Sequence, residues 1–179
     1  MIGAIAMIMM PKKLDFIKGY PSGGAALVKP KPRNLLDEAQ KFMLKRGGKD
    51  LVFSEAEINN YLNQRLQGTQ TGLMASLIQF KGCYIDFSPG IAEVYVERSI
   101  FGFPLTMSAR VRIQRIRQNM QWRAAGGTIG KFSLNSRQLK PVLEVFVRML
   151  ENCKDERDVL NQLVDVRFEK DQVVLDSSY

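Results

Sequence analysis

The clearest pattern in the chain is a strict alternation of apolar and polar residues over residues 103–116. Apolar side chains occupy the odd positions from Phe103 to Ile113, and the even positions hold Thr106, Ser108, Arg110, Arg112 and Gln114. Since successive side chains of a strand point to opposite faces of a sheet, this stretch predicts a long strand with one buried face and one wet, basic face.

Shorter extended segments lie on both sides of this strand. Residues 91–99, 120–124 and 164–169 alternate in the same way, and residues 77–87 are extended with a break at Gly82. Residues 77–87 and 91–99 precede it and are separated by a Ser-Pro-Gly turn signal, residues 120–124 follow it, and residues 164–176 form a closing hairpin. Because connections this short join antiparallel neighbours, we expect an antiparallel meander, with about five to seven strands in all.

Helices are predicted on both sides of the strands. Asn34 can cap a first helix, and Ser54 and Glu57 form a capping box that begins a second helix over residues 54–67. A third helix is predicted over residues 140–153, with a proline in its first turn, where a missing N–H costs little.

The 140–153 helix is predicted to be apolar over most of its circumference. Its polar residues form one narrow stripe of Glu144, Arg148 and Glu151. Such a helix must be covered on several sides, by a curved sheet, a second helix or a lipid. We expect Phe146 and Leu150 in the core and a ligand groove beside the helix. The candidates for lining this groove are Val142, Phe146, Met149 and Leu150.

Together these elements predict an α+β fold, in which a twisted antiparallel sheet meander packs on a long apolar helix, with two further N-terminal helices. Residues 34–179 would form one domain. Residues 14–33 contain three Pro and three Gly without a sustained period. This composition predicts a linker, either a tether or an irregular arm.

Residues 1–13 begin with ten uncharged residues, followed by Pro11, Lys12 and Lys13. Ten apolar residues are too few to span a bilayer, which needs about 20, and they lack the basic start of a signal peptide. The segment is either an apolar stretch that packs on the domain or is disordered, or the trailing part of a membrane anchor. We favour the anchor, because an apolar run followed by Pro and two Lys is typical of a chain leaving a membrane. Against it, Lys just after a span usually marks the cytoplasmic side.

The net charge of +8 is concentrated in two regions. Residues 1–49 carry a net +7, and residues 98–143 hold nine Lys or Arg and no Asp or Glu. The residues that could bind an anion are Arg98, Arg110, Arg112, Arg115, Arg117, Arg123 and Lys131. One interpretation is a solvated sheet face, partly neutralised across strands by Glu93 and Glu97. The other is an anionic partner, namely phospholipid headgroups, a cell-wall polymer or nucleic acid.

Proteins that bind single-stranded nucleic acid place aromatic side chains among cationic side chains on one face. Residues 106–114 carry no aromatic at their polar positions, which favours a headgroup or a polymer over bases.

Several chemistries find no support in the sequence. Histidine is absent, which excludes Ser-His and Cys-His pairs and histidine metal ligands within the chain. The glycine-rich residues 125–132 fail as a phosphate loop, because Ala125 and Phe132 replace the required Gly and Ser or Thr. We therefore predict a protein that is not an enzyme and needs no metal or cofactor.

Cys83 and Cys153 are expected to be two buried thiols, with a single disulfide as the alternative.

The order of elements carries a resemblance to a known family. A helix begins with Ser-Glu-Ala-Glu-Ile-Asn-Asn-Tyr-Leu at residues 54–62, a β meander follows, and Gly-Thr-Ile-Gly-Lys-Phe-Ser-Leu at residues 127–134 leads to a long helix and a closing strand. This layout, over residues 51–176, resembles the membrane-anchored domains of bacterial envelopes of the YpmS type and their tubular-lipid-binding relatives. The resemblance implies an extracytoplasmic α+β domain on one N-terminal span, without catalytic residues.

We therefore expect a non-catalytic, membrane-tethered domain of the bacterial cell envelope that binds a lipid or an anionic envelope component, on the outer side of the cell membrane. The alternative is a soluble nucleic-acid-binding module that uses the basic sheet face over residues 98–131. A partner protein and an oligomeric state are not indicated by the sequence.

Overall fold

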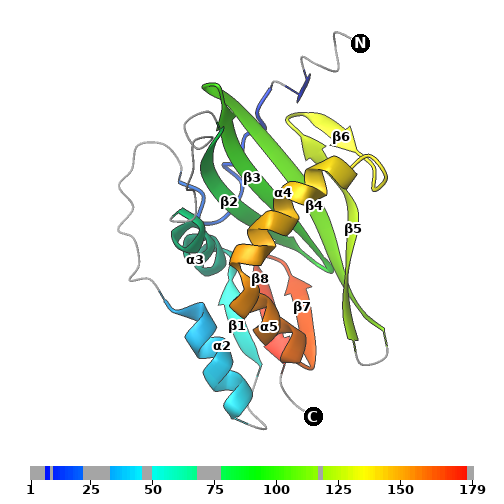
Figure 1. Ribbon diagram of the computed structural model, residues 1–179. Coiled ribbons are helices and arrows are strands. Elements are labelled where there is room, and N and C mark those ends of the chain that lie inside the picture. The colour runs from blue at the N-terminus through cyan, green and yellow to red at the C-terminus, as the bar shows by residue number, and fades with distance from the viewer. Residues whose placement is uncertain are drawn as a thin grey trace.

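The computed structural model describes residues 7–8, 10–21, 33–45, 50–67, 78–116 and 119–176, without the side chains of residues 67, 114–116, 119–120, 141–142, 145, 148 and 150. The chain forms two antiparallel sheets flanked by helices (Figure 1). The larger, five-stranded sheet has the order β2-β3-β4-β5-β6, and the smaller, three-stranded sheet has the order β1-β8-β7.

The larger sheet consists of β2 (Ile78–Ser88), β3 (Ile91–Ile100), β4 (Phe103–Ile116), β5 (Asn119–Ile129) and β6 (Phe132–Leu134). The smaller consists of β1 (Leu51–Ser54), β7 (Asp165–Glu169) and β8 (Gln172–Asp176). The helices are α2 (Leu35–Leu44), α3 (Glu55–Gln67), α4 (Lys140–Asn152) and α5 (Lys154–Gln162). The predicted α+β class and antiparallel meander are confirmed. The closing hairpin pairs with β1 in a sheet of its own, which the alternation did not indicate.

One face of the five-stranded sheet packs against α4, which crosses in front of the meander in Figure 1. Val96, Met107 and Ala109 from the strands are buried together with Leu139 and Phe146. These strand positions share the parity that the alternation predicted to be buried, so the buried face of β4 is confirmed at Met107 and Ala109. The prediction is wrong for Phe103 at the start of the strand, which is 62% exposed because it lies next to the β3–β4 turn.

The prediction of a long, almost wholly apolar helix is not supported. α4 has 13 residues, and it turns one apolar side to the sheet. Phe146 is 7% exposed, as predicted, whereas Val147 on the same helix is 52% exposed. A helix lying on one face of a sheet needs only one apolar stripe, and single exposed apolar residues are ordinary at a protein surface. The side chains of Val142 and Leu150 lie outside the described residues.

The smaller sheet has its own core, covered by α2 and α5. Leu35 and Ala39 of α2 and Val159 of α5 are buried with Phe53 and Leu175 of the sheet. The first predicted helix therefore packs on this second core, to which Phe87 and Ala92 of the meander also contribute.

Residues 10–21, which we call the N-terminal arm, cover the opposite face of the five-stranded sheet. Leu14 and Ile17 are 1% and 3% exposed, because they pack with Tyr84 and Tyr95 of the neighbouring strands. Of the two predictions for the linker, the structure shows an irregular arm over the described part. Residues 22–32 lie outside the described residues.

The N-terminal arm also corrects the prediction that the whole polar side of β4 is wet. Thr106 and Ser108 are 1% and 0% exposed, whereas Arg110 and Arg112 on the same side are exposed. The first half of this polar side is covered by a segment about ninety residues away in sequence, which alternation within the strand cannot indicate.

α3 lies along the free edge of β2 and bonds to its backbone. Asn59 accepts from the Ile85 N–H at 2.6 Å and donates to the Ile85 carbonyl at 2.9 Å. Asn63 makes the same pair of bonds with Cys83, at 2.9 and 2.6 Å. One turn earlier, Glu55 accepts from the next N–H along this edge at 2.8 Å. Because an unpaired edge is a template for aggregation, these side chains act in place of a further strand.

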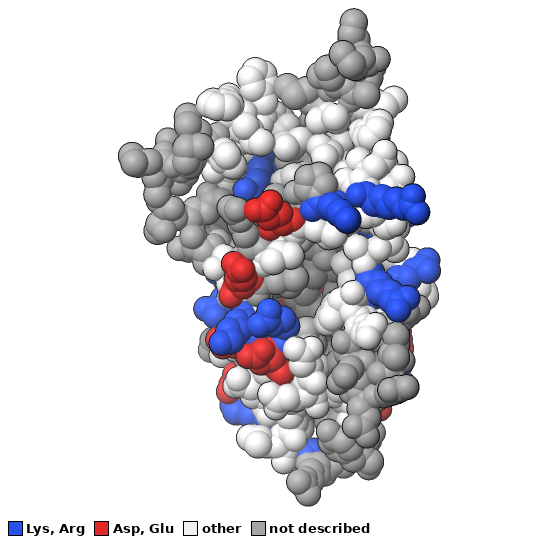
Figure 2. Space-filling view, turned by 45° about the vertical axis from the view of Figure 1, so that its right-hand side comes forward, with Lys and Arg blue, Asp and Glu red and all other residues white. Residues whose placement is uncertain are grey.

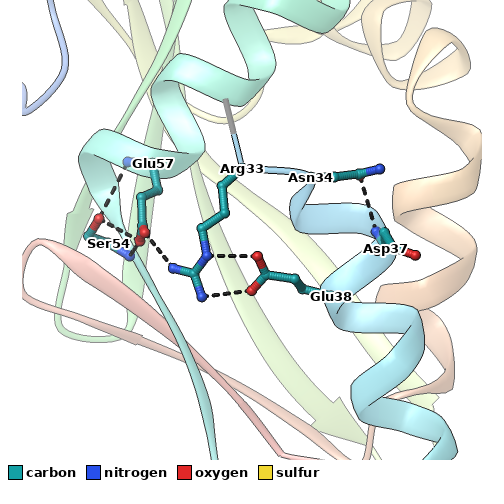
Figure 3. A network of polar contacts seen from close by, with 6 residues as sticks. All are labelled: Arg33, Asn34, Asp37, Glu38, Ser54 and Glu57. Carbon is teal, nitrogen blue, oxygen red and sulfur yellow. Dashed lines mark hydrogen bonds and ion pairs between the residues drawn. The ribbon is translucent and has the colours of Figure 1, made fainter. Parts of the chain in front are cut away.

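Arg33 ties the starts of α2 and α3 together (Figure 3). Its guanidinium donates to both Glu38 oxygens, at 2.7 and 2.6 Å, and to Glu57. The predicted capping box is confirmed, because the Ser54 N–H and hydroxyl donate to Glu57 at 2.9 and 2.8 Å. Burial alone would raise the pKa of Glu57, but the bonds from Ser54 and Arg33 outweigh it and hold this pKa below its ordinary value. Asn34 caps α2, as predicted.

Cys83 and Cys153 are both buried free thiols, which is the first of the two alternatives predicted for them. Burial raises the pKa of Cys83 to about 12, and that of Cys153 to about 11. Since the thiolate is the reactive form, both side chains are unreactive core residues.

Only part of the predicted apolar segment, residues 1–13, falls within the described residues. Met7 and Met10 are 52% and 51% exposed, and the Met7 carbonyl accepts from the Lys131 N–H at 2.9 Å. Within the described ranges, no helix has both the length and the apolar character needed to cross a membrane.

Candidate anion-binding site

Beyond the end of β3, strands β4 and β5 continue as a two-stranded ribbon. Pairing of β4 with β3 ends at Val111, whereas pairing with β5 runs on to Ile116 and Asn119. Residues 110–123 hold five Arg and no Asp or Glu. We call this segment the arginine ribbon, and in Figure 1 it extends to the lower right of the meander.

Arg112 and Arg123 stand directly opposite each other in the ribbon. Both side chains are exposed, and neither forms an ion pair with another side chain that the structure describes. Like charges placed directly opposite on one face of a sheet destabilise the strand pair. The pair therefore lowers the stability of the free protein, which is the opposite of what a purely structural role requires.

A β-bulge in β5 adds Arg110 to the same surface. The register between β4 and β5 shifts at this point, so Ala125 and Gly126 together oppose Arg110. Gly126 has a φ of 112°, and a side chain there would approach the Arg110 guanidinium to 3.1 Å. Bulges change the direction of side chains. Here the bulge leaves room for the guanidinium to lie along the backbone of β5, on the same side of β4 as Arg112.

The cross-strand ion pairs predicted between these arginines and Glu93 or Glu97 are absent from the described residues. Glu93 lies opposite Arg110, but the Lys12 ammonium approaches its carboxylate to 4.0 Å. Glu97 instead accepts from the Tyr20 hydroxyl at 3.2 Å. Both alternative partners come from the N-terminal arm. The arginines at the open end of the sheet are therefore left without the carboxylates that were expected to neutralise them.

The other predicted anion-binding residues do not join this surface. Arg98 lies opposite Leu105, on the face that packs against α4, and Lys131 lies in the β5–β6 turn at the other end of β5. The side chain of Arg115 and all of Arg117 lie outside the described residues. Figure 2, which brings the side with β5 and β6 forward, shows basic side chains gathered along the right-hand edge with few acidic neighbours. The structure thus gathers three of the candidates, which we call the arginine cluster: Arg110, Arg112 and Arg123.

Two shallow hollows adjoin the arginine cluster. One, of about 280 Å³, is lined by Pro89, Gly90, Ile91, Arg112 and Ile113. The other, of about 360 Å³, lies between Gly90, Ile113 and residues 165–169 of β7. Both are open to solvent, whereas a small-molecule site normally encloses most of its ligand. The surface is better suited to an extended partner that lies across it.

The structure places two of the four groove candidates in the core itself. Phe146 is buried, and Met149 is partly buried against the same cluster of sheet residues. Neither of the two hollows borders α4. The side chains of Val142 and Leu150 are not among those described.

A second polar cluster lies beneath the N-terminal arm. Tyr95 is 1% exposed, and the Lys12 ammonium donates to its hydroxyl at 3.0 Å. Ser108 donates to Glu93 at 2.6 Å and lies 2.9 Å from the Thr128 hydroxyl. Burial and the nearby Glu93 raise the pKa of Tyr95 well above its ordinary value. These groups satisfy one another beneath the arm and fasten it to the sheet. Among the described residues, no three of His, Cys, Asp and Glu gather into a possible metal site.

One aromatic residue of the ribbon was not singled out from the sequence. Trp122 is 43% exposed next to Arg123, and its ring lies 6.5 Å from that of Phe168 in the smaller sheet. The alternation over residues 120–124 places Trp122 on the opposite face from Arg123. Its contact with β7 depends on how the two sheets meet, and no pattern within the strand carries that information.

No protein-family model matches this chain, and neither a curated protein nor a solved structure matches it.

Proposed function

We propose that this protein is a non-catalytic binding domain that holds an anionic, phosphate-bearing polymer along the arginine ribbon. The observation that carries the proposal is the directly opposed pair of Arg112 and Arg123, exposed and without an acidic partner among the described residues. A polyanion placed between the two guanidinium groups converts their mutual repulsion into two charge-assisted contacts.

The shape of the surface supports a polymer over a small anion. The cluster lies on a projecting strand pair beside open hollows, so a phosphate there would remain largely in water. A single exposed ion pair contributes about 0–1 kcal/mol. Useful affinity therefore needs several contacts along the ribbon, which only a repeating anion supplies.

The proposal keeps the membrane attachment expected from the sequence. An apolar stretch leads into the N-terminal arm, and the layout resembles envelope domains of the YpmS type. We propose that the preceding chain attaches the domain to a bacterial membrane, on its outer side, where phosphate-bearing envelope polymers are the available partners.

Nucleic acid is the second candidate, and one observation favours it. Trp122 is partly exposed beside Arg123. In proteins that bind single-stranded nucleic acid, bases stack on aromatic rings and nearby cations contact the phosphate backbone. The ring beside Trp122 is Phe168 of the smaller sheet, and Tyr84 and Tyr95 of the meander are buried under the arm. With one exposed ring on the opposite side of the ribbon, stacking of several bases lacks a platform.

The experiment is a salt titration of binding to fluorescently labelled inorganic polyphosphate, followed by anisotropy. The variant R112A/R123A removes two phosphate contacts, so we expect weaker binding and a slope of log K against log salt that is smaller by about 1.4–1.8. The matched control R137A/K154A removes two exposed basic residues elsewhere and should leave the slope unchanged.

Two results would contradict the proposal. Equal losses in both double variants would mean that net charge, not the ribbon, attracts the polymer. Tighter binding to single-stranded DNA than to polyphosphate of the same charge, with a loss on W122A confined to DNA, would put the second candidate first.

A further inference from the structure

Two large aromatic side chains are exposed at the end of the sheet opposite the arginine ribbon. Phe101 is 70% exposed and Phe103 is 62% exposed, and they flank Gly102 in the turn between β3 and β4. We call residues 101–103 the phenylalanine tip. A contiguous exposed apolar patch commonly marks a site of contact with a protein, a ligand or a membrane.

The backbone of this tip is strained. Ile100 and Phe103 are paired, so the turn has two residues, Phe101 with a φ of 50° and Gly102 with a φ of 84°. Two positive φ angles define a type I′ turn, which strongly prefers Asn-Gly. A bulky residue at positive φ is an outlier, and such strain is commonly kept at functional sites. Phe101 is therefore poorly suited to the turn that carries it.

The phenylalanine tip lies at the same end of the sheet as Met7, one of the described residues of the apolar N-terminal segment. The Gly130 N–H donates to the Thr106 carbonyl at 2.6 Å, so the β5–β6 turn lies about three residues, or roughly 10 Å, from Phe103 along β4. Met7 contacts that turn, because its carbonyl accepts a hydrogen bond from the Lys131 N–H. In Figure 1 the β3–β4 and β5–β6 turns both lie at the top.

The charge at this end suits an anionic, apolar partner. Residues 7–8, 10–13, 78–82, 98–105 and 129–133 lie toward this end and include no Asp or Glu, and Lys13, Lys81 and Lys131 among them are exposed. Lysines around exposed aromatic and methionine side chains are the composition of a surface that lies in the headgroup region of a bilayer.

We propose that the phenylalanine tip inserts into the interfacial layer of an anionic phospholipid bilayer, next to the point where the N-terminal segment meets it. The inference rests on the membrane attachment in the proposed function and gives the domain an orientation. Arg112 is nine residues from Phe103 along β4, so the arginine ribbon is held about 30 Å from the headgroups. At that distance the ribbon faces a polymer outside the membrane rather than the lipid.

The first test measures partition of the full chain onto vesicles of phosphatidylcholine and phosphatidylglycerol in equal parts. F101N/F103N places Asn-Gly in the turn and removes both rings, so we expect an unchanged or higher melting temperature together with about tenfold weaker partition. The control L44N/V52N removes two exposed apolar side chains from α2 and β1 and should leave partition unchanged. Unchanged partition in F101N/F103N overturns the proposal.

The second test reports which end of the sheet meets the lipid. Trp122, the one tryptophan of the chain, lies in the ribbon, so phospholipids with brominated acyl chains should not quench the natural protein. The variant F101W/W122F moves the reporter to the tip, where the same lipids should quench it strongly. Quenching of the natural protein and not of the variant would mean that the ribbon end meets the membrane, and would overturn the proposal.

Failure here is distinguishable from failure of the proposed function. F101N/F103N should bind inorganic polyphosphate as the natural protein does, and R112A/R123A should partition onto the vesicles of phosphatidylcholine and phosphatidylglycerol as the natural protein does. If F101N/F103N changes the sedimentation coefficient of the protein in the absence of vesicles, the tip contacts a second copy of the chain instead, and the membrane proposal is overturned.

Discussion

The polar side of β4 is divided into two regions that look alike in sequence and differ in structure. Thr106 and Ser108 are almost wholly buried, whereas Arg110 and Arg112, in the same alternation, are exposed. The first region is covered by the N-terminal arm, and the second extends past β3 into solvent. The comparison shows that burial on this face is decided by what lies over it, and not by the polarity of the strand.

The two regions also differ in whether their charged side chains have partners. In the covered region, Glu93 and Glu97 have hydrogen-bonding or charged partners from the arm and from neighbouring strands. In the ribbon, Arg112 and Arg123 face each other without an acidic partner among the described residues. Groups that satisfy one another are suited to stability, and groups that repel one another are suited to a partner.

The largest effect should follow from removing the cover. Leu14 is 1% exposed under the arm, so L14A should destabilise the protein by about 3–4 kcal/mol, measured by urea unfolding. Leu44 is 83% exposed, and L44A should change the free energy of unfolding by less than about 0.5 kcal/mol. Equal effects of the two substitutions would show that the arm is not docked in solution.

A somewhat smaller loss is expected at the edge of β2. Asn59 bonds to the backbone of Ile85 and also donates to the Lys18 carbonyl at 2.8 Å. N59A leaves these groups without partners and should cost about 2–3 kcal/mol. N60A, on the same helix, is the control and should cost less than half as much. If N59A raises no tendency to aggregate and costs no more than N60A, the edge is protected by something else.

The covered region should also respond to pH. Burial raises the pKa of Glu97, and the hydrogen bond from Tyr20 offsets this only in part. The folded state therefore keeps this proton to a higher pH than the unfolded state, and stability falls as pH rises from about 4.3 through the folded pKa. The melting temperature of E97Q relative to the natural protein should increase between about pH 4 and pH 7. A difference that does not change with pH would mean that Glu97 is more hydrated than the structure shows.

The smallest effect is expected in the ribbon, and its sign is opposite. R123Q removes a directly opposed like charge and should stabilise the free protein by about 0.2–1 kcal/mol, while weakening binding to polyphosphate. R137Q, at an exposed basic residue outside the ribbon, should change neither property. A variant R123Q that is less stable than the natural protein would show that the two arginines do not repel each other.

Much of the fold follows from local patterns. The alternation over residues 103–116 predicted β4 and the buried parity of its apolar residues, and Ser54 and Glu57 marked the start of α3. Such features depend on neighbours within a few residues. The site was predicted in outline only, as a set of seven cations, of which the structure brings together Arg110, Arg112 and Arg123.

The features that were missed depend on contacts between remote segments. Nothing in residues 106–108 indicates that Leu14 and Ile17 pack on Tyr95, which lies opposite Ser108 on the neighbouring strand. Glu55, Asn59 and Asn63 are spaced four residues apart and so lie on one helix face, but this spacing does not show that a bare strand edge lies beside them. Counting apolar residues around α4 overestimated its burial for the same reason.

Hydrogen–deuterium exchange of the full chain, with and without inorganic polyphosphate, tests the distinction between the two regions most directly. We expect the polymer to slow exchange at backbone amides of residues 110–123 and to leave residues 93–108 and the N-terminal arm unchanged, because the covered region is already closed. Slower exchange confined to segments outside the ribbon, or spread equally over every basic surface, would contradict the account.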